Sequence, residues 1–355
     1  MKRLLFFGLW FVFVALLLQL AGWIYIAVIH PKPIEGYGYP TGLTVPDARL
    51  GYAYKPGFSG LFNGPGYREI PIEINAEGFR DAPFEPASEG RARIAFLGDS
   101  VVFGAGVRAE DRFTDCLEAG GGGAEPGSTP PSILNLGVNS YTFGHYLEIA
   151  RQDFFGLKPS AVVVGLTLND FAPMDDSGTA RRMRRHADGL HTPEWVFRIK
   201  ERIAGTYAVR FLSALSAQLH YFLMSTDKRE EYHTKWMRSV VAAWQQPETR
   251  AAFAADLDRF AALMQQDHLP FGFVVFPELN DVLRPDAFSG PRQTVLALLK
   301  ERNFKVCDPY DDFARQPDAQ SLFLAHDSVH YDPAGHRLMC ESVRRCLDDW
   351  GFLTP

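Results

Sequence analysis

A serine, an aspartate and a histidine in this sequence have the types and spacing of a hydrolytic centre. Ser100 ends the tripeptide Gly98-Asp99-Ser100 after a short apolar run, and Asp327 precedes His330 by three residues. A serine hydroxyl becomes an effective nucleophile when a histidine accepts its proton, and a carboxylate fixes the histidine tautomer and stabilises the imidazolium. The sequence therefore predicts Ser100 as nucleophile, His330 as base and Asp327 as its partner.

Acyl transfer also needs hydrogen-bond donors for the oxyanion that develops on the carbonyl oxygen. Three candidates are the backbone N–H of Ser100, the backbone N–H of Gly137 and the side-chain amide of Asn169. A glycine at position 137 would let a substrate approach the backbone closely. The acidic neighbours Asp99 and Asp170 are expected to be structural, as turn and hydrogen-bonding residues.

Two other histidines compete with His330 for the role of base. His336 falls inside the last predicted helix, where packing or exposure is expected. His326 adjoins Asp327 but lacks the three-residue spacing. Gly-Asp-Ser alone is a weak signal, since Gly and Asp are ordinary turn residues, and Asp327 also suits the cap of a turn.

The chain around these residues alternates between short apolar runs and helical patterns. Strands are predicted at 93–97, 132–136, 161–168, 271–276 and 305–308, and helices at 111–118, 146–155, 249–267, 293–303 and 333–350. This alternation predicts an α/β fold with a five-stranded parallel sheet and helices on both faces. Asp332 and Pro333 are expected to begin the last helix as its N-cap and first residue.

Ligands of open parallel sheets bind at the carboxyl ends of the strands. Ser100, Gly137 and Asn169 each follow a predicted strand, and the segment from Asp327 to His330 follows the fifth. Because these ends meet at one edge of a sheet, the separate segments are expected to form one site.

Three regions differ in composition. Residues 1–30 are mostly apolar, and residues 31–92 are rich in Gly, Pro and Tyr, which predicts an extended tether with short strands. Residues 93–355 carry the α/β domain, with a helical insertion at about 172–247.

The insertion allows two interpretations. Four arginines between 181 and 185 suit a solvated charged face, or contact with anionic lipid headgroups or an acidic glycan. The apolar and aromatic half from Trp195 to Trp244 reads as helices that cover the site, rest on the membrane or simply enlarge the domain.

The N-terminal region predicts a membrane anchor. Leu4 to Ile29 contains no charged residue, and about 20 apolar residues suffice to span a bilayer as a helix. Lys2 and Arg3 precede it, so the positive-inside rule places the N-terminus in the cytoplasm and the catalytic domain in the periplasm or outside the cell, or in a lumen. The alternative is a cleaved signal peptide, whose apolar region of about 7–15 residues is shorter.

Composition restricts the partners. The formal net charge of −6 gives no basic field for nucleic acid. No CxxC or HExxH spacing occurs, so neither a metal nor another cofactor is implied. Cys340 and Cys346 lie six residues apart on one predicted helix, which argues against a bond between them; Cys116 bonded to one of them and free buried thiols both stay open.

These motifs resemble the blocks of the SGNH/GDSL hydrolase superfamily. Gly98-Asp99-Ser100 is similar to its first block, Gly137 in NLGVNSY to its second, Asn169-Asp170 to its third and Asp327-Ser328-Val329-His330 to its DxxH block. They occur in the family's order over about residues 93–350. The third block departs from the usual Gly-x-Asn-Asp, because the glycine lies two residues farther away.

The resemblance implies a flavodoxin-like three-layer fold and the hydrolysis or transfer of an acyl ester. In that fold the first and last helices share one face, which favours Cys116 bonded to Cys340 or Cys346. The segment Gly78 to Asp81 (GFRD) also resembles membrane-tethered bacterial members associated with cell-surface polysaccharides.

Three functions are consistent with these features. The first is an exported esterase that removes an acyl group, such as acetyl, from a carbohydrate or lipid through an acyl-enzyme on Ser100. The second is an O-acyltransferase with the same site, for which the resemblance implies an integral-membrane acyltransferase as partner. The third is a non-catalytic scaffold in the cell envelope, against which the complete set of site residues argues.

Overall fold

The computed structural model describes residues 2–25, 40, 42–64, 67–88, 90–121, 129–172, 174, 206–209, 211–212, 215, 226–325 and 327–353. Predictions for His326, for Trp195 and for the arginines between 181 and 185 lie outside the described residues.

The five predicted strands form one parallel sheet. They are β5 (Arg93–Gly98), β6 (Ser132–Gly137), β7 (Ala161–Leu166), β8 (Phe271–Val275) and β9 (Lys305–Cys307), in the order β6-β5-β7-β8-β9. This is the doubly wound order 2-1-3-4-5 of flavodoxin-like sheets. Every residue of β5 and of β7 is buried, as expected for strands covered on both faces.

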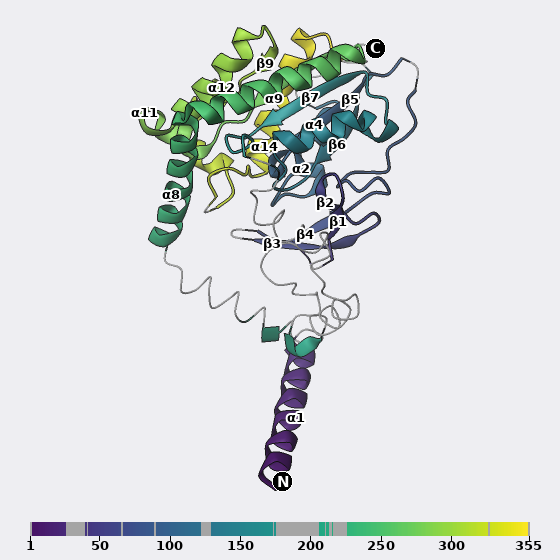
Figure 1. The fold of residues 1–355 in the computed structure, drawn as a ribbon, viewed down its shortest axis with the longest axis vertical. Helices are drawn as coiled ribbons and strands as arrows, with labels where there is room; N and C mark the ends of the chain where they lie inside the picture. The colour runs from purple at the N-terminus through teal and green to yellow at the C-terminus, as the bar shows by residue number, and fades with distance from the viewer. Residues whose placement is uncertain are drawn as a thin grey trace.

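Helices cover both faces of this sheet (Figure 1). One core contains side chains from α4 (Phe143–Arg151), α9 (Pro247–Gln266) and α12 (Gly290–Glu301). The opposite core contains side chains from α3 (Phe113–Glu118) and α14 (Pro333–Asp349). The other helices described in this domain are α2 (Ser100–Phe103), α8 (Thr226–Gln245), α10 (Leu279–Leu283), α11 (Pro285–Phe288) and α13 (Tyr310–Ala314).

The start of α14 is as predicted. The side chain of Asp332 is the N-cap and accepts a hydrogen bond from the N–H of Gly335 at 2.7 Å, and Pro333 is the first helical residue. The cap thereby fixes the point at which the loop that carries Asp327 and His330 ends and α14 begins.

The described part of residues 31–92 is not an extended tether, which corrects the prediction. It contains two antiparallel hairpins, β1 (Thr44–Asp47) with β2 (Gly51–Tyr54) and β3 (Ser59–Gly64) with β4 (Tyr67–Glu73). Alternate side chains of these strands point to one face, as the period of two requires. Buried members of that face join the same core as the sheet, among them Tyr52, Tyr54, Phe62, Ile70 and Ile72. The short strands were predicted, but their burial was not.

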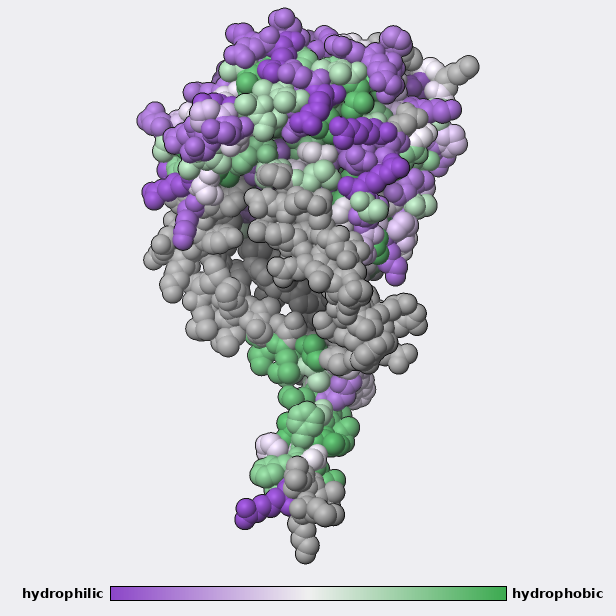
Figure 2. Space-filling model, viewed as in Figure 1, coloured by the Kyte–Doolittle hydropathy of each residue, from purple (hydrophilic) through white to green (hydrophobic). Residues whose placement is uncertain are grey.

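Helix α1 (Lys2–Trp23) projects from the rest of the chain (Figure 1). Its segment Phe6–Trp23 has a mean hydropathy of 2.0 and is long and apolar enough to cross a membrane. Large apolar side chains are exposed along it, including Phe7, Trp10 and Phe11, the last at 74%. Figure 2 shows this helix as a mostly hydrophobic stalk below a domain surface rich in hydrophilic residues.

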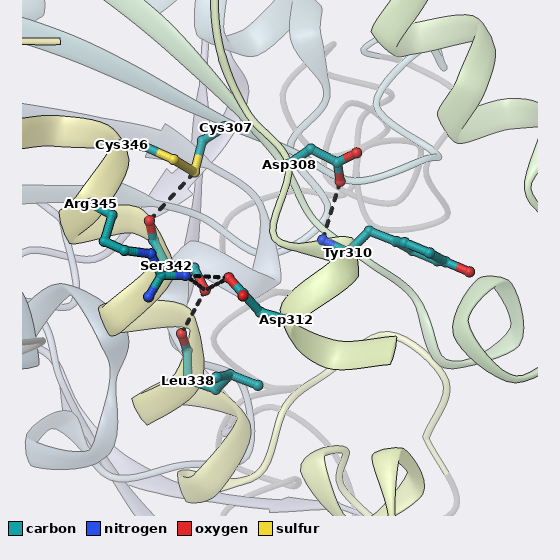
Figure 3. The surroundings of a disulfide bond; sticks show 8 residues. All are labelled: Cys307, Asp308, Tyr310, Asp312, Leu338, Ser342, Arg345 and Cys346. Carbon is teal, nitrogen blue, oxygen red and sulfur yellow. Dashed lines mark hydrogen bonds and ion pairs between the residues drawn. A yellow bond between two sulfur atoms is a disulfide. The ribbon is translucent and has the colours of Figure 1, made fainter. Parts of the chain in front are cut away.

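All four cysteines are paired. Cys116 on α3 is bonded to Cys340 on α14, which is one of the two pairings that the family resemblance favoured. Cys307 on β9 is bonded to Cys346 on α14, a pairing that the sequence analysis did not consider. Around this second bond, the Asp312 carboxylate contacts Ser342 and Arg345 of α14 (Figure 3). The two bonds attach the last helix to both α3 and the edge strand.

Two double variants, each of which removes one of the two disulfides, should separate the contributions of these bonds to stability. We expect Cys307→Ser with Cys346→Ser to lower the free energy of unfolding by about 2–4 kcal/mol, because the bond restricts the unfolded chain. Cys116→Ser with Cys340→Ser should cost more, since that bond closes a sequence separation of 224 residues against 39. Urea unfolding of the detergent-solubilised protein measures both, and equal stability of all three proteins would contradict the prediction.

Candidate active site

The nucleophile sits on a sharp turn between strand and helix. β5 ends at Gly98, and Ser100 begins α2. The buried Asp99 caps this helix by accepting a hydrogen bond from the N–H of Val101 at 3.0 Å. A Cβ on Gly98 would lie 2.2 Å from Val102 Cγ2, so the turn needs glycine there. The half-buried Ser100 is therefore held at the carboxyl end of a central strand.

Asp327, His330 and Ser100 form one continuous chain of hydrogen bonds. The Nε2 atom of His330 lies 2.8 Å from Ser100 Oγ, and its Nδ1 atom lies 2.7 Å from Asp327 Oδ2. Asp327 Oδ1 also accepts from the N–H groups of Val329 at 2.8 Å and His330 at 3.0 Å. One carboxylate thus shapes the loop and orients the imidazole, which leaves Nε2 to accept the serine proton.

Asp327 and His330 each stabilise the charged form of the other. Burial acts to raise the pKa of Asp327, but the charge and hydrogen bonds of His330 and the N–H of Val329 outweigh it and lower that pKa to about 2. Burial acts to lower the pKa of His330, but the charge and hydrogen bond of Asp327, with Asp99 and Glu278, raise it above its ordinary value. Asp327 is therefore ionised at neutral pH and stabilises the imidazolium that proton transfer from Ser100 would create.

Gly137 has a packing role besides the oxyanion role predicted for it. Its N–H donates to Asn135 Oδ1 at 3.0 Å in this structure. A Cβ at this position would lie 2.3 Å from the backbone nitrogen of Phe103 in α2. The glycine therefore permits the close approach of α2 to β6, and its donation to an oxyanion stays a prediction.

Asn169 follows β7 and lies at the same sheet edge as Ser100. Its Oδ1 atom accepts a hydrogen bond from Thr167 Oγ1 at 2.8 Å, which fixes the orientation of the amide. The acceptor side of the amide is thus occupied, and its –NH₂ group is the part suited to donate to an oxyanion. The N–H of Ser100 lies in the first turn of α2, where no carbonyl of the helix itself accepts from it.

A buried network of carboxyls orients Asn169. Thr167 Oγ1 also lies 2.9 Å from Asp99 Oδ2 and 3.2 Å from Asp170 Oδ1. Burial raises the pKa of Asp99, and burial together with the charge of Asp99 raises the pKa of Asp170 well above its ordinary value. The network is satisfied when one carboxyl is protonated and donates to Thr167, which leaves the threonine proton for Asn169. Asp99 and Asp170 are thus structural, as predicted.

The GFRD segment packs beneath the nucleophile. Arg80 is buried and donates to the carbonyl oxygens of Phe103 at 3.2 Å, Gly104 at 2.7 Å and Val107 at 2.8 Å. These carbonyls belong to the end of α2 and the turn after it. Asp81 Oδ2 accepts from the backbone N–H of Asn135 in β6 at 2.9 Å. The sequence singled out this segment only by resemblance; the structure gives it a role in fixing the helix that begins with Ser100.

The first hairpin supports the loop after β6. Tyr52 Oη donates to the carbonyl oxygen of Asn139 at 2.6 Å, and the N–H of Asn139 donates to Tyr54 Oη at 2.9 Å. The next residue, Ser140, has a φ of +64°, in the left-handed region that favours glycine. Two buried tyrosines from the region predicted as a tether therefore hold a strained loop in place, and no local sequence signal indicated this.

His336, the other described candidate for the base, takes no part in the hydrogen-bonded chain of Ser100. His336 is buried in α14 and stacks on Phe113, whose N–H donates to His336 Nδ1 at 3.3 Å. Burial, followed by the charges of Arg112, His330 and Arg80, lowers the pKa of His336 to about 3, so this residue is a neutral packing group. Within the described parts of the chain, no three or more His, Cys, Asp or Glu side chains gather in a way that could hold a metal ion.

No protein-family model and no curated protein sequence matches this chain. Solved structures with a similar fold include a lipase/acylhydrolase from Enterococcus faecalis, at 12% identity and a TM-score of 0.41, covering 75% of this chain and 98% of that one. A lipolytic protein of the G-D-S-L family from Desulfitobacterium hafniense has 13% identity, a TM-score of 0.39 and coverage of 72% and 100%. A catalytic mutant of an acetylxylan esterase from Geobacillus stearothermophilus has 14% identity, a TM-score of 0.36 and coverage of 74% and 96%. The chain is similar to these hydrolases, and the assignment of its chemistry depends on the side-chain geometry around Ser100.

Proposed function

We propose that this protein is a membrane-tethered serine esterase that cleaves acyl esters, such as acetyl esters, on a carbohydrate or lipid outside the cytoplasm. The observation that carries the proposal is the continuous chain from Asp327 through His330 to Ser100, with both hydrogen bonds below 3 Å. A packed structural serine does not need a half-buried carboxylate–histidine pair aligned on its hydroxyl.

The geometry around Ser100 supports the following first half of the reaction. Ser100 Oγ attacks the ester carbonyl carbon while His330 Nε2 takes its proton, and Asp327 stabilises the imidazolium. The carbonyl oxygen becomes an oxyanion, to which the N–H of Ser100 and the amide of Asn169 donate hydrogen bonds. His330 then gives its proton to the leaving alcohol oxygen, which leaves the acyl group on Ser100.

The second half repeats these steps with a new nucleophile. A water molecule gives its proton to His330 and attacks the acyl-enzyme, and the acid is released as Ser100 recovers its proton. A sugar hydroxyl in the place of water would make the protein an O-acyltransferase, supplied with acyl groups by an integral-membrane acyltransferase. The triad serves both reactions, so the acceptor decides between them.

An ester assay tests the proposal. The detergent-solubilised full-length protein should hydrolyse p-nitrophenyl acetate. Product analysis with water and sugar acceptors in competition then separates hydrolysis from transfer. Absence of turnover with every acyl ester, in protein that is folded and disulfide-bonded, would contradict the assignment.

Two features support the location. Helix α1 has the length and apolarity of a membrane span. Both cysteine pairs are bonded, and such bonds persist in oxidising compartments. With Lys2 and Arg3 on the cytoplasmic side, the α/β domain lies in the periplasm or outside the cell.

Protease protection tests this orientation. In a bacterial host, we expect the full-length protein to remain in the membrane fraction after carbonate washing. Protease added to intact spheroplasts should digest the α/β domain, because the domain faces outward. Digestion that requires lysis of the spheroplasts would contradict the orientation, and recovery in the soluble fraction would contradict the anchor.

A further inference from the structure

We propose that Glu278 and Trp244 are positioning residues that hold the Leu168 backbone from both sides and thereby place the Asn169 amide for the oxyanion. The inference rests on the proposed function. It assigns a positioning role to Trp244, at the end of the insertion, and to Glu278, in the loop after β8.

The contacts meet at a single residue. The N–H of Leu168 donates to Glu278 Oε1 at 3.2 Å, and Trp244 Nε1 donates to the carbonyl oxygen of Leu168 at 2.7 Å. Leu168 itself is buried. These bonds fix the two successive peptide units that flank Leu168, and the second of these units leads directly to Asn169. Thr167, on the other side of Leu168, donates a hydrogen bond to Oδ1 of the Asn169 side-chain amide and so fixes that oxygen.

The two clamping residues come from different parts of the chain. Trp244 lies near the end of α8, where its buried ring packs on Phe171 and Phe253. Glu278 lies just after β8, at the N-terminal boundary of α10. Backbone order at Asn169 therefore depends on contacts between α8, the β7 loop and the β8 loop.

Glu278 also joins the Asn169 loop to the loop of the base. Its neighbour Leu279 donates its N–H to the carbonyl oxygen of Ser328 at 2.9 Å. On the other side, Tyr331 Oη donates to the carbonyl oxygen of Pro277 at 2.7 Å. Residues 277–279 thus connect the segment that carries Asp327 and His330 with the segment that carries the oxyanion donor.

A buried carboxyl group with an unpaired oxygen lowers the stability of the fold, so the presence of Glu278 at this position calls for an explanation. Glu278 is 1% exposed, and its Oε2 atom has no hydrogen-bond partner among the described residues. Burial, with the charges of Asp281, Asp99 and Asp327, raises the pKa of Glu278 to about 8, which favours the neutral acid. Glutamine, which is neutral and retains the Oε1 acceptor, is therefore a close substitute, whereas leucine removes the acceptor and leaves the Leu168 N–H unpaired.

The test is a double-mutant cycle with Asn169, measured as kcat and KM for an acyl ester. Asn169→Ala should lower kcat by about 10²–10³-fold, the cost of losing one oxyanion donor. Glu278→Leu should lower kcat by about 10–10²-fold with KM nearly unchanged, and Glu278→Gln should stay within about threefold of the unaltered protein. Trp244→Phe, which removes only the indole N–H and some ring volume, should behave like Glu278→Leu.

The Asn169→Ala background separates positioning from a general structural role. If Glu278 and Trp244 act through the amide, their substitutions should cost less than about threefold there, because residues that act through one group are not additive. Glu301→Leu at the exposed end of α12 and Trp350→Phe after α14 serve as matched controls that should leave kcat unchanged.

Equal losses in both backgrounds, or no loss in either, would overturn the inference while leaving the proposed function in place. Turnover in folded Ser100→Ala above about a hundredth of that of the unaltered protein would instead overturn the proposed function and this inference with it. If Glu278→Leu does not fold, as judged by circular dichroism, Trp244→Phe carries the same cycle.

Discussion

Replacing Ser100 with alanine should lower kcat/KM for an acyl ester by at least about 10⁴-fold, because no other group can form the acyl-enzyme. The oxyanion donors and the bound substrate would still give a small residual rate over water. The substitution removes one oxygen from a half-buried side chain, so stability should change little. Steady-state kinetics on the purified full-length protein measure the effect.

The control for this variant is Ser132→Ala at the first residue of β6, the opposite end of the sheet from the site. It should keep full activity. If Ser100→Ala retained more than about a hundredth of the activity while folded, the hydroxyl that faces His330 would not be the nucleophile.

Replacing Asp327 with asparagine should lower kcat by about 10⁴-fold, because the amide no longer selects the imidazole tautomer that leaves Nε2 as the acceptor of the serine proton. It also removes the charge that, against burial, raises the pKa of His330. Both effects act through the hydrogen bond between His330 Nδ1 and Asp327 Oδ2, which is 2.7 Å long.

The pH dependence of the same variant gives an independent result. In the unaltered protein, kcat/KM should fall as the pH drops through the raised pKa of His330, since only the neutral imidazole accepts a proton. In Asp327→Asn this acidic limb should move to lower pH, because the charge and hydrogen bond of Asp327, the largest causes that raise the pKa of His330, are gone while burial, which lowers that pKa, remains. An unchanged limb would contradict the pairing; Asp311→Asn, in an exposed pair with Arg315, is the control.

The sheet and the triad could be predicted because their signals are local. The buried strands are mostly apolar runs, and their alternation with helices indicates a parallel sheet; the order of the strands was implied only by the family resemblance. The segment from Asp327 to His330 carries both partners within one turn, so their contact did not depend on knowing the rest of the fold. Ser100 needed only the expectation that strand ends meet at one edge.

Other features could not be predicted because they depend on neighbours that are distant in sequence. Nothing around Gly137 in the sequence indicates that a helix backbone lies against it, and only the position of Phe103 shows this. The Gly- and Pro-rich composition of residues 31–92 concealed the alternate burial of Tyr52 and Tyr54, which the packed loop at Asn139 requires.

Long-range contacts also account for what was missed. Cys307 pairs with Cys346 because β9 lies beside α14, a proximity that cysteine spacing does not express. Glu278 and Trp244 reach the same peptide from segments far apart in sequence. Nothing in the residues around either one distinguishes it from an ordinary loop acid or a packed aromatic.

The most direct test of the account is to trap the covalent intermediate. The folded, disulfide-bonded protein is treated with a fluorophosphonate, digested with protease and analysed by mass spectrometry. We predict a single phosphonylated peptide with the label on Ser100, and loss of that label in His330→Ala but not in His268→Asn, an exposed histidine after α9. Labelling elsewhere, or an unlabelled Ser100 in active protein, would contradict the acyl-enzyme mechanism.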